Sequence, residues 1–319
     1  MYTLDYIKEI LKNKKEKKRI IFPEGEEEKI QKVATYLVEN DLCEPILLFK
    51  DNVNSNLSKK IKQISINSLD LNLYAKDLFD LRKGKLKSID EALMYVGKAN
   101  YLANMMLYKN EGDCILCGLS YTTADTLRPA LQIIKTKPDV SVASSIIIMK
   151  KGENCYFFGD CSLNLNPSSQ ELADITKSFV NFAIKMGLKD PTVSLLSYST
   201  NGSGLGPDVD KVKNAVDLLL KENVNFKLDG EIQFDAAFCK EVRDKKYKNS
   251  LNKNESADIF VFPTLDAGNI GYKIAQRMGG YEAIGPIILG LNKPVNDLSR
   301  GATLIDIIQA AVLTVYMAI

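Results

Sequence analysis

The sequence predicts an α/β fold with a mainly parallel sheet, because short apolar runs alternate with amphipathic stretches along the chain. In residues 207–222, for example, Val209, Val212, Val216 and Leu219 recur at helical spacing. Strands that alternate with helices of this length are joined by right-handed crossovers, which place neighbouring strands parallel. Eight apolar runs are strand candidates: residues 19–22, 45–49, 114–117, 145–149, 156–158, 192–196, 258–262 and 286–289.

Helices are expected between many of these strands. Residues 258–280 run from a strand through a loop into a helix. The apolar residues 307–319 form a buried helix, since they are far shorter than the roughly 20 residues that span a bilayer. The motif KTKPDVS interrupts the pattern, so a domain division is expected near residues 137–145. Four amphipathic stretches are further helix candidates: residues 27–40, 88–108, 169–187 and 207–222.

The composition is that of an ordinary globular protein, with 45% hydrophobic and 26% charged residues in a chain of 319. A net charge of +2 gives no indication of a nucleic-acid surface. The basic cluster at residues 12–19 either contacts an anionic partner or ends a helix, where cations complement the helix dipole. The N-terminus carries no apolar signal core and the six cysteines are scattered, so a cytoplasmic protein without a membrane anchor is expected.

The chain contains no histidine, which excludes Ser-His-Asp triads, Cys-His dyads and histidine metal sites. Proton transfer therefore falls to a carboxylate, Lys, Tyr, Cys or the substrate itself. Cys114 and Cys117 form a CxxC motif, but their run is typical of a buried strand and no second pair follows. Neither a zinc site nor a redox site is indicated there.

Two loops that follow predicted strands have the composition of ligand sites. After residues 114–117 come the hydroxyls of Ser120, Thr122 and Thr123 and then Arg128, which form either an anion site or a helix N-cap with a surface arginine.

The second loop, SYSTNGSGLGP at residues 197–207, carries three glycines and forms either a phosphate cradle or a tight polar turn. It lacks the dinucleotide fingerprint, because Pro207 takes the place of its last glycine. Asp229 nevertheless lies at about the distance of a ribose-binding acid.

Two further segments place charged side chains beside helix starts. In residues 258–280, Asn269 and Lys273 are candidates to reach a ligand, and Arg277 lies one turn beyond Lys273. Alone, Arg277 is typical of a solvated helix position.

In NKPVNDLSRGATLIDIIQAAVL, Ser299 and Arg300 lie in a loop before a helix. Thr303 and Asp306 have the spacing of a capping-box variant. Capping accounts for these two residues but leaves the hydroxyl of Ser299 and the cation of Arg300 unexplained.

Several long stretches, in the same order, make nearly the whole chain similar to the phosphate acetyltransferase family. The sister phosphate butyryltransferases share this architecture, but DGEIQFDAA and NIGYKIAQRMGGYEAIGP resemble the acetyl enzymes more closely. The matching stretches are IIFPEGEEEKI, TTADTLRPALQIIKT, FGDCSLNLNPSSQELADI, LSYSTNGSGLGP, DGEIQFDAA, PTLDAGNIGYKIAQRMGG, AIGP and KPVNDLSRGATLIDI.

This resemblance implies two three-layer α/β/α domains with mainly parallel sheets, as in isocitrate and isopropylmalate dehydrogenases. The first domain is expected to comprise residues 1–142 plus 298–319, so that the final helix returns to it. The second is expected to comprise residues 143–297, with the active site in the cleft between the two domains.

The resemblance also assigns roles to individual residues. Ser299, Arg300 and Asp306 correspond to the catalytic group, and Arg277 to a substrate-binding arginine. Arg128 in TLRPA and Arg82 in DLRKGK match positions linked to coenzyme A and phosphate binding; the motif around Arg82 is the shorter one. Many relatives have His where this chain has Tyr121, so no imidazole acts there.

The implied reaction is the exchange of an acetyl group between phosphate and coenzyme A by direct thiol attack in a ternary complex. Coenzyme A is then a substrate, no bound cofactor or metal is expected, and the family suggests a homodimer. Asp306 would take the thiol proton, which requires a raised Asp306 pKa, a depressed thiol pKa or both. A butyryl-preferring enzyme is one alternative. A metal- and NAD-dependent dehydrogenase is another, but the sequence shows neither its fingerprint nor its carboxylate cluster.

Overall fold

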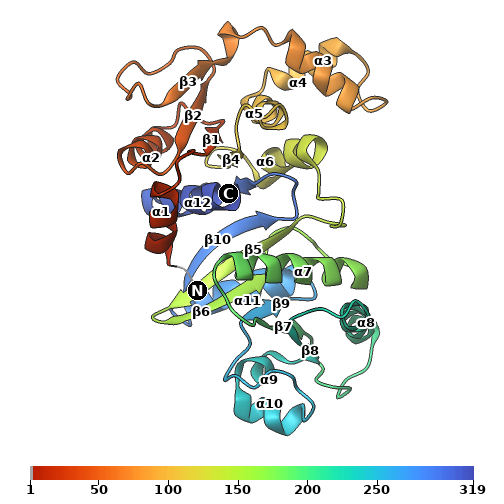
Figure 1. Ribbon diagram of the computed structural model, residues 1–319. Coiled ribbons are helices and arrows are strands. Elements are labelled where there is room, and N and C mark those ends of the chain that lie inside the picture. The colour runs from red at the N-terminus through yellow and green to blue at the C-terminus, as the bar shows by residue number, and fades with distance from the viewer. Residues whose placement is uncertain (1–2) are drawn as a thin grey trace. The chain divides into compact units, whose positions relative to one another are not determined.

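A computed structural model describes residues 3–319, and these divide into two compact units (Figure 1). We call residues 3–136 and 291–319 the terminal unit and residues 137–290 the central unit. The boundaries lie six or seven residues earlier in the chain than those expected from the sequence. The second boundary moves because the strand Val295–Asp297 pairs with the strand Cys114–Cys117 and so belongs to the terminal unit.

The terminal unit is built on a five-stranded sheet in which every pair of neighbours is parallel. The strand order is β11-β4-β1-β2-β3. These strands are β1 (Arg19–Phe22), β2 (Glu44–Phe49), β3 (Lys62–Ser65), β4 (Cys114–Cys117) and β11 (Val295–Asp297). Because β1, β4 and β11 are parallel neighbours, the loops that follow them leave the same edge of the sheet.

Helices cover both faces of this sheet. On one face, α12 packs on β1 and β4 and also contacts α1 and α2 (Figure 1). On the other face, α5 packs on β1 and β4 and also contacts α3 and α4. The predicted single helix over residues 88–108 is two helices, since the chain turns at Gly97 and Lys98. The helices are α1 (Leu4–Lys12), α2 (Glu28–Glu39), α3 (Asn72–Leu81), α4 (Ile89–Val96), α5 (Ala99–Tyr108), α6 (Thr123–Pro129), which continues into the turn η2 (Ala130–Ile134), and α12 (Leu304–Met317), with a 3₁₀ turn η1 (Ile66–Ser68) after β3.

The central unit contains a six-stranded sheet in the order β10-β5-β6-β9-β7-β8. β5 is antiparallel to both of its neighbours, and the remaining pairs are parallel. Its strands are β5 (Ser144–Lys151), β6 (Asn154–Gly159), β7 (Thr192–Leu196), β8 (Lys227–Ile232), β9 (Ile259–Val261) and β10 (Glu282–Leu289).

Helices also lie on both faces of the central sheet. In Figure 1, α7 runs across one face of this unit, beside α8, whereas α11 packs on β5, β6 and β10 from behind. The α/β prediction with mainly parallel sheets is therefore confirmed. The helices are α7 (Ser169–Lys185), α8 (Pro207–Lys221), α9 (Phe234–Phe238), α10 (Lys240–Lys246) and α11 (Leu265–Arg277).

All eight predicted strands are present, but three strands were missed. β3 (KQIS), β8 (KLDGEI) and β11 (VND) are polar or very short, so they lack the apolar run that identifies a buried strand. None of the helices within residues 3–319 is both long enough and apolar enough to cross a membrane.

The start of α11 comes into backbone contact with the loop after β6, and a glycine permits this. A Cβ on Gly268 would overlap the carbonyl oxygen of Asp160. Because that obstacle is backbone, it cannot swing aside as a side chain would. Gly268 therefore fixes the distance between α11 and the loop at residues 160–164.

We predict that Gly268→Ala lowers the free energy of unfolding by about 1–3 kcal/mol, as overpacking does. Gly97→Ala is the matched control, because Gly97 has right-handed backbone and its added Cβ would meet only the carbonyl oxygens of Leu93 and Met94, at the ordinary contact distances of 3.4 and 3.7 Å. Urea unfolding of the full chain measures both variants. Equal effects of the two substitutions would refute the close contact at Gly268.

Candidate active site

Three loops follow the neighbouring strands β1, β4 and β11 of the terminal unit, and a single carboxylate organises two of them. Glu24, just after β1, is 6% exposed. It accepts hydrogen bonds from the backbone amides of residues 118–121, including Gly118 at 2.8 Å and Tyr121 at 3.2 Å, and from the Ser120 hydroxyl at 2.7 Å. The backbone of the loop after β4 thus surrounds the buried carboxylate of Glu24.

This arrangement decides between the two interpretations of that loop. Ser120 uses both its amide and its hydroxyl on Glu24. Thr122 caps α6 by accepting from the amide of Asp125, and Thr123 donates to Asp297. The three hydroxyls proposed for an external anion are therefore engaged within the protein, and the helix-cap interpretation holds.

The loop after β11 carries Ser299 and Arg300, and both are exposed. The Ser299 hydroxyl accepts from the amide of Gly301 at 3.4 Å, and its carbonyl accepts from the amide of Ala302. Lys29 on α2 donates to the Ala302 carbonyl at 2.9 Å. The loop is a tight turn held by α2, and it presents one hydroxyl and one guanidinium to solvent.

Asp306 closes a capping box with Thr303 at the start of α12. Its Oδ2 accepts from the Thr303 amide and hydroxyl, both at 2.8 Å, while the Asp306 amide donates back to the hydroxyl at 3.2 Å. The Asp306 side chain is exposed. The chain itself therefore does not bury this carboxylate.

Tyr101 is buried, and burial raises the pKa of its phenol, while the positive charges of Arg128 and Arg82 oppose this rise. Tyr101 also donates to Gln132 at 3.0 Å and packs on Tyr95, with ring centroids 4.7 Å apart. These arginines come from the end of α3 and from α6, which are far apart in the sequence.

Lys98 is a further cation of the terminal unit. Its ammonium lies 5.4 Å from the centroid of the Tyr95 ring, and the side chain is exposed. No local pattern indicated Lys98 or Tyr101, because their contacts depend on the turn between α4 and α5.

The other three predicted ligand residues lie on α11 of the central unit. Lys273 donates to the side-chain oxygen of Asn269 at 2.7 Å, and Asn269 donates to the Cys161 carbonyl at 3.0 Å. Arg277 ends the helix and is exposed. Burial raises the pKa of Tyr272, and the positive charge of Arg277 opposes this rise. Asn269 thus positions Lys273.

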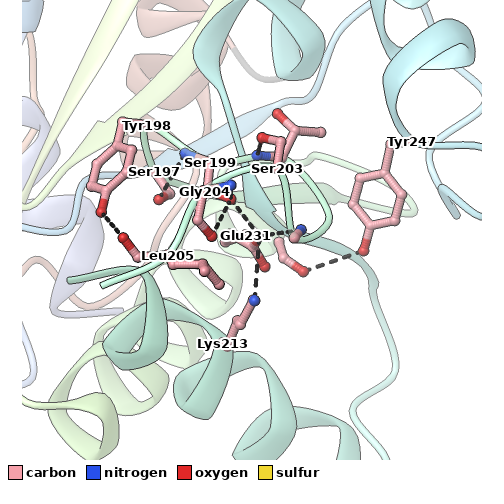
Figure 2. A network of polar contacts seen from close by, with 12 residues as sticks. Ser197, Tyr198, Ser199, Ser203, Gly204, Leu205, Lys213, Glu231 and Tyr247 are labelled. Carbon is pink, nitrogen blue, oxygen red and sulfur yellow. Dashed lines mark hydrogen bonds and ion pairs between the residues drawn. The ribbon is translucent and has the colours of Figure 1, made fainter. Parts of the chain in front are cut away.

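The glycine-rich loop 197–206 is a tight polar turn (Figure 2). The buried carboxylate of Glu231 accepts from the Ser199 hydroxyl at 2.8 Å and from the Gly202 amide at 2.7 Å. The Gly204 amide donates to the Ser199 hydroxyl, so the loop satisfies its own donors. Asp229 is buried and accepts from the Ser250 hydroxyl and the Leu251 amide, which leaves no ribose-binding acid there.

The CxxC pair is also structural. Cys114 and Cys117 are buried in β4, and burial raises the pKa of both thiols well above the ordinary value. Neither is available as a thiolate at neutral pH.

Comparison with known proteins supports the resemblance found in the sequence. A model of the phosphate acetyl/butaryl transferase family matches residues 2–315. A phosphate acetyltransferase of Mycoplasma capricolum is 52% identical over 322 residues, with 100% of both chains covered. A phosphotransacetylase structure from Streptococcus pyogenes has a TM-score of 0.93 at 38% identity and covers 99% of both chains.

The chain belongs to the phosphate acetyl/butaryl transferase family. A more distant structure, a 4-hydroxythreonine-4-phosphate dehydrogenase from Klebsiella pneumoniae, has a TM-score of 0.52 at 13% identity over 95% of this chain. That likeness extends to the fold alone and agrees with the dehydrogenase-like architecture expected from the sequence.

We predict that Glu24→Gln destabilises the chain by about 1–3 kcal/mol, because an amide nitrogen would face backbone donors that it cannot satisfy. Glu27→Gln is the matched control in the same segment, since the Glu27 side chain makes no capping bond to α2. Chemical denaturation of both variants measures the difference. Indistinguishable unfolding free energies would show that the loop at residues 118–121 does not depend on Glu24.

Proposed function

We propose that the protein is a phosphate acetyltransferase that exchanges an acetyl group between acetyl phosphate and coenzyme A. The observation that carries this proposal is the Ser299–Arg300 turn, presented at the start of α12 beside Asp306 in a chain 52% identical to a phosphate acetyltransferase. Coenzyme A, acetyl phosphate and inorganic phosphate are its substrates and products.

In the proposed step the thiol sulfur of coenzyme A attacks the acetyl carbonyl carbon. A carbon–sulfur bond forms, the bond from this carbon to the phosphate oxygen breaks, and phosphate leaves with the bonding electrons. The thiol proton passes to Asp306. Arg300 and the positive end of the α12 dipole stabilise the negative charge on the phosphoryl oxygens, and Ser299 donates a hydrogen bond to them.

The proton transfer is unfavourable between groups of ordinary pKa. Passing a proton from a thiol of pKa about 8.5 to an aspartate of pKa about 3.9 costs roughly 6 kcal/mol. Arg300 and the start of α12 close this gap by stabilising the thiol anion.

The remaining cations are assigned to binding. Arg82 and Arg128 bind the phosphates of coenzyme A, and the influence of both charges on the Tyr101 phenol supports one shared subsite. Lys98 adds charge at its rim. On the central unit, Arg277 binds the phosphoryl end of acetyl phosphate, with Lys273 held nearby by Asn269.

A homodimer in the cytoplasm fits the surface of the chain. Ile270 and Ile274 of α11 and its C-cap residue Met278 recur at a spacing of four and are 57%, 52% and 85% exposed. Such a stripe is suited to burial against a second copy. Cys43, Cys114, Cys117, Cys161 and Cys239 are free thiols, as expected in a reducing compartment. Sedimentation of the purified protein measures the assembly, and a monomeric mass would reject the dimer.

The proposed activity is tested by mixing the full chain with coenzyme A and either acetyl phosphate or butyryl phosphate. Formation of the thioester is followed by its ultraviolet absorbance. We expect acetyl phosphate to react with the higher kcat/KM. A preference for butyryl phosphate would assign the chain to the butyryl branch, and no thioester with either substrate would overturn the proposal.

We predict that Asp306→Asn lowers kcat by about 10²–10⁴, the usual contribution of a general base, and leaves the KM for acetyl phosphate almost unchanged. Thr303→Ala is the control, since it removes the hydroxyl of the capping box, costs about 1 kcal/mol of stability and keeps the carboxylate. Steady-state kinetics separates the two roles. A fully active Asp306→Asn variant would reduce Asp306 to a helix cap.

A further inference from the structure

Asp297 is a buried carboxylate two residues before Ser299, and the proposed step does not use it. It is the last residue of β11, in register with Cys117 of β4, and is 7% exposed. Its Oδ2 accepts a 2.7 Å hydrogen bond from the hydroxyl of Thr123, the first residue of α6. Its Oδ1 is buried without a hydrogen-bond partner among residues 3–319.

Gly118 lies between this carboxylate and Glu24. Its amide donates to Glu24 at 2.8 Å, and a Cβ on Gly118 would overlap Oδ1 of Asp297. Its φ of +113° is a conformation that favours glycine. The Gly118 backbone thus lies between two carboxylates, that of Glu24 after β1 and that of Asp297 at the end of β11.

We propose that Asp297 is a positioning residue for the acyl transfer, because its ionised carboxylate holds the Ser299–Arg300 turn against the start of α6. This inference rests on the function proposed for that turn. The Leu298 amide donates to the Cys117 carbonyl at 2.7 Å, so the turn leaves the sheet from a fixed point. A misplacement of about 1 Å in a reacting group costs about a hundredfold in rate.

The hydrogen bonds explain why the ionised form is needed. A carboxylate accepts a stronger bond from the Thr123 hydroxyl than a neutral acid does. Asp297 therefore holds the turn firmly above its pKa and loosely below it.

The surroundings of Asp297 favour its protonated form more than water does. Burial raises the pKa of Asp297, and the neighbouring Glu24 carboxylate raises it further, while the hydroxyls of Thr123 and Thr126 oppose the rise. The Cys117 thiol on β4 also faces it, but its own pKa is raised by burial and it stays neutral. No ionisable group of α12, the other helix packed on β11, contributes to the shift.

The raised pKa of Asp297 makes the stability of the folded chain depend on pH. The unfolded chain releases this proton at a lower pH than the folded chain, so the ionised side chain costs stability from the ordinary aspartate pKa upward. Asp297→Asn removes the charge and keeps an acceptor for Thr123. We expect its thermal midpoint at neutral pH to equal or exceed that of the wild type, while kcat falls by about tenfold or more.

The decisive experiment compares kcat against pH for the wild type, Asp297→Asn, Thr123→Val and Thr123→Ser. In the wild type, kcat should fall on the acid side as Asp297 takes up its proton. Thr123→Val should move this acid limb to higher pH, because it removes a hydrogen bond that lowers the pKa. Thr123→Ser should leave the limb in place, and Asp297→Asn should lack it.

The same acid limb in all four proteins would overturn the proposal. So would an Asp297→Asn variant that has a lowered thermal midpoint and an unchanged kcat, since this describes a purely structural acid. Failure of the wild type to form acetyl-coenzyme A would instead reject the proposed function. The pH dependence of the thermal midpoints needs no activity and would still show whether Asp297 titrates above the ordinary aspartate range.

Discussion

The hydrogen bonds that converge on the buried carboxylate of Glu24 are the interaction on which the candidate site depends. The parallel order of β11, β4 and β1 brings three loops to one edge of the sheet, but a sheet edge alone does not order the loops. Glu24 orders the loop at residues 118–121, and this loop in turn meets Asp297 and leads into α6. The exposed side chains of Arg128 and Arg300 therefore extend from ordered segments of the chain.

In the central unit, too, acidic side chains order loops by accepting hydrogen bonds from their backbone amides. Asp160, after β6, accepts from the backbone amides of Ser162, Leu163 and Asn164. Glu231 similarly organises the glycine-rich loop after β7. In each case an acidic side chain turns inward and satisfies the amides of a loop that follows a strand. The bonded amides are not available to an external anion, which supports the proposal that exposed arginines and lysines bind the substrate phosphates.

The sequence predicted most of the helices and strands well, because each of these has a local signal. Apolar runs located β1, β4 and β7, and the Thr303–Asp306 spacing located the start of α12. The resemblance supplied the family, and the comparisons confirm it. Short strands such as β11 carried no such signal.

The buried acids could not be found in the same way. Glu24 lies in a run of glutamates, EGEEE, that reads as a solvated surface, and only the neighbouring β4 loop reveals its role. The exposure of Asp306 also depends on how α12 faces outward, which spacing does not determine. Partners that are distant in sequence decide which polar residues are buried, so local patterns miss them.

Hydrogen–deuterium exchange resolved to single amides tests the role of Glu24 most directly. If its carboxylate holds the loop, the amides of residues 118–121 should exchange as slowly as those of the buried strand β4, although they belong to a loop without sheet pairing. Exchange at the rates of exposed loop amides would contradict the account, because these amides would then not be held by the Glu24 carboxylate.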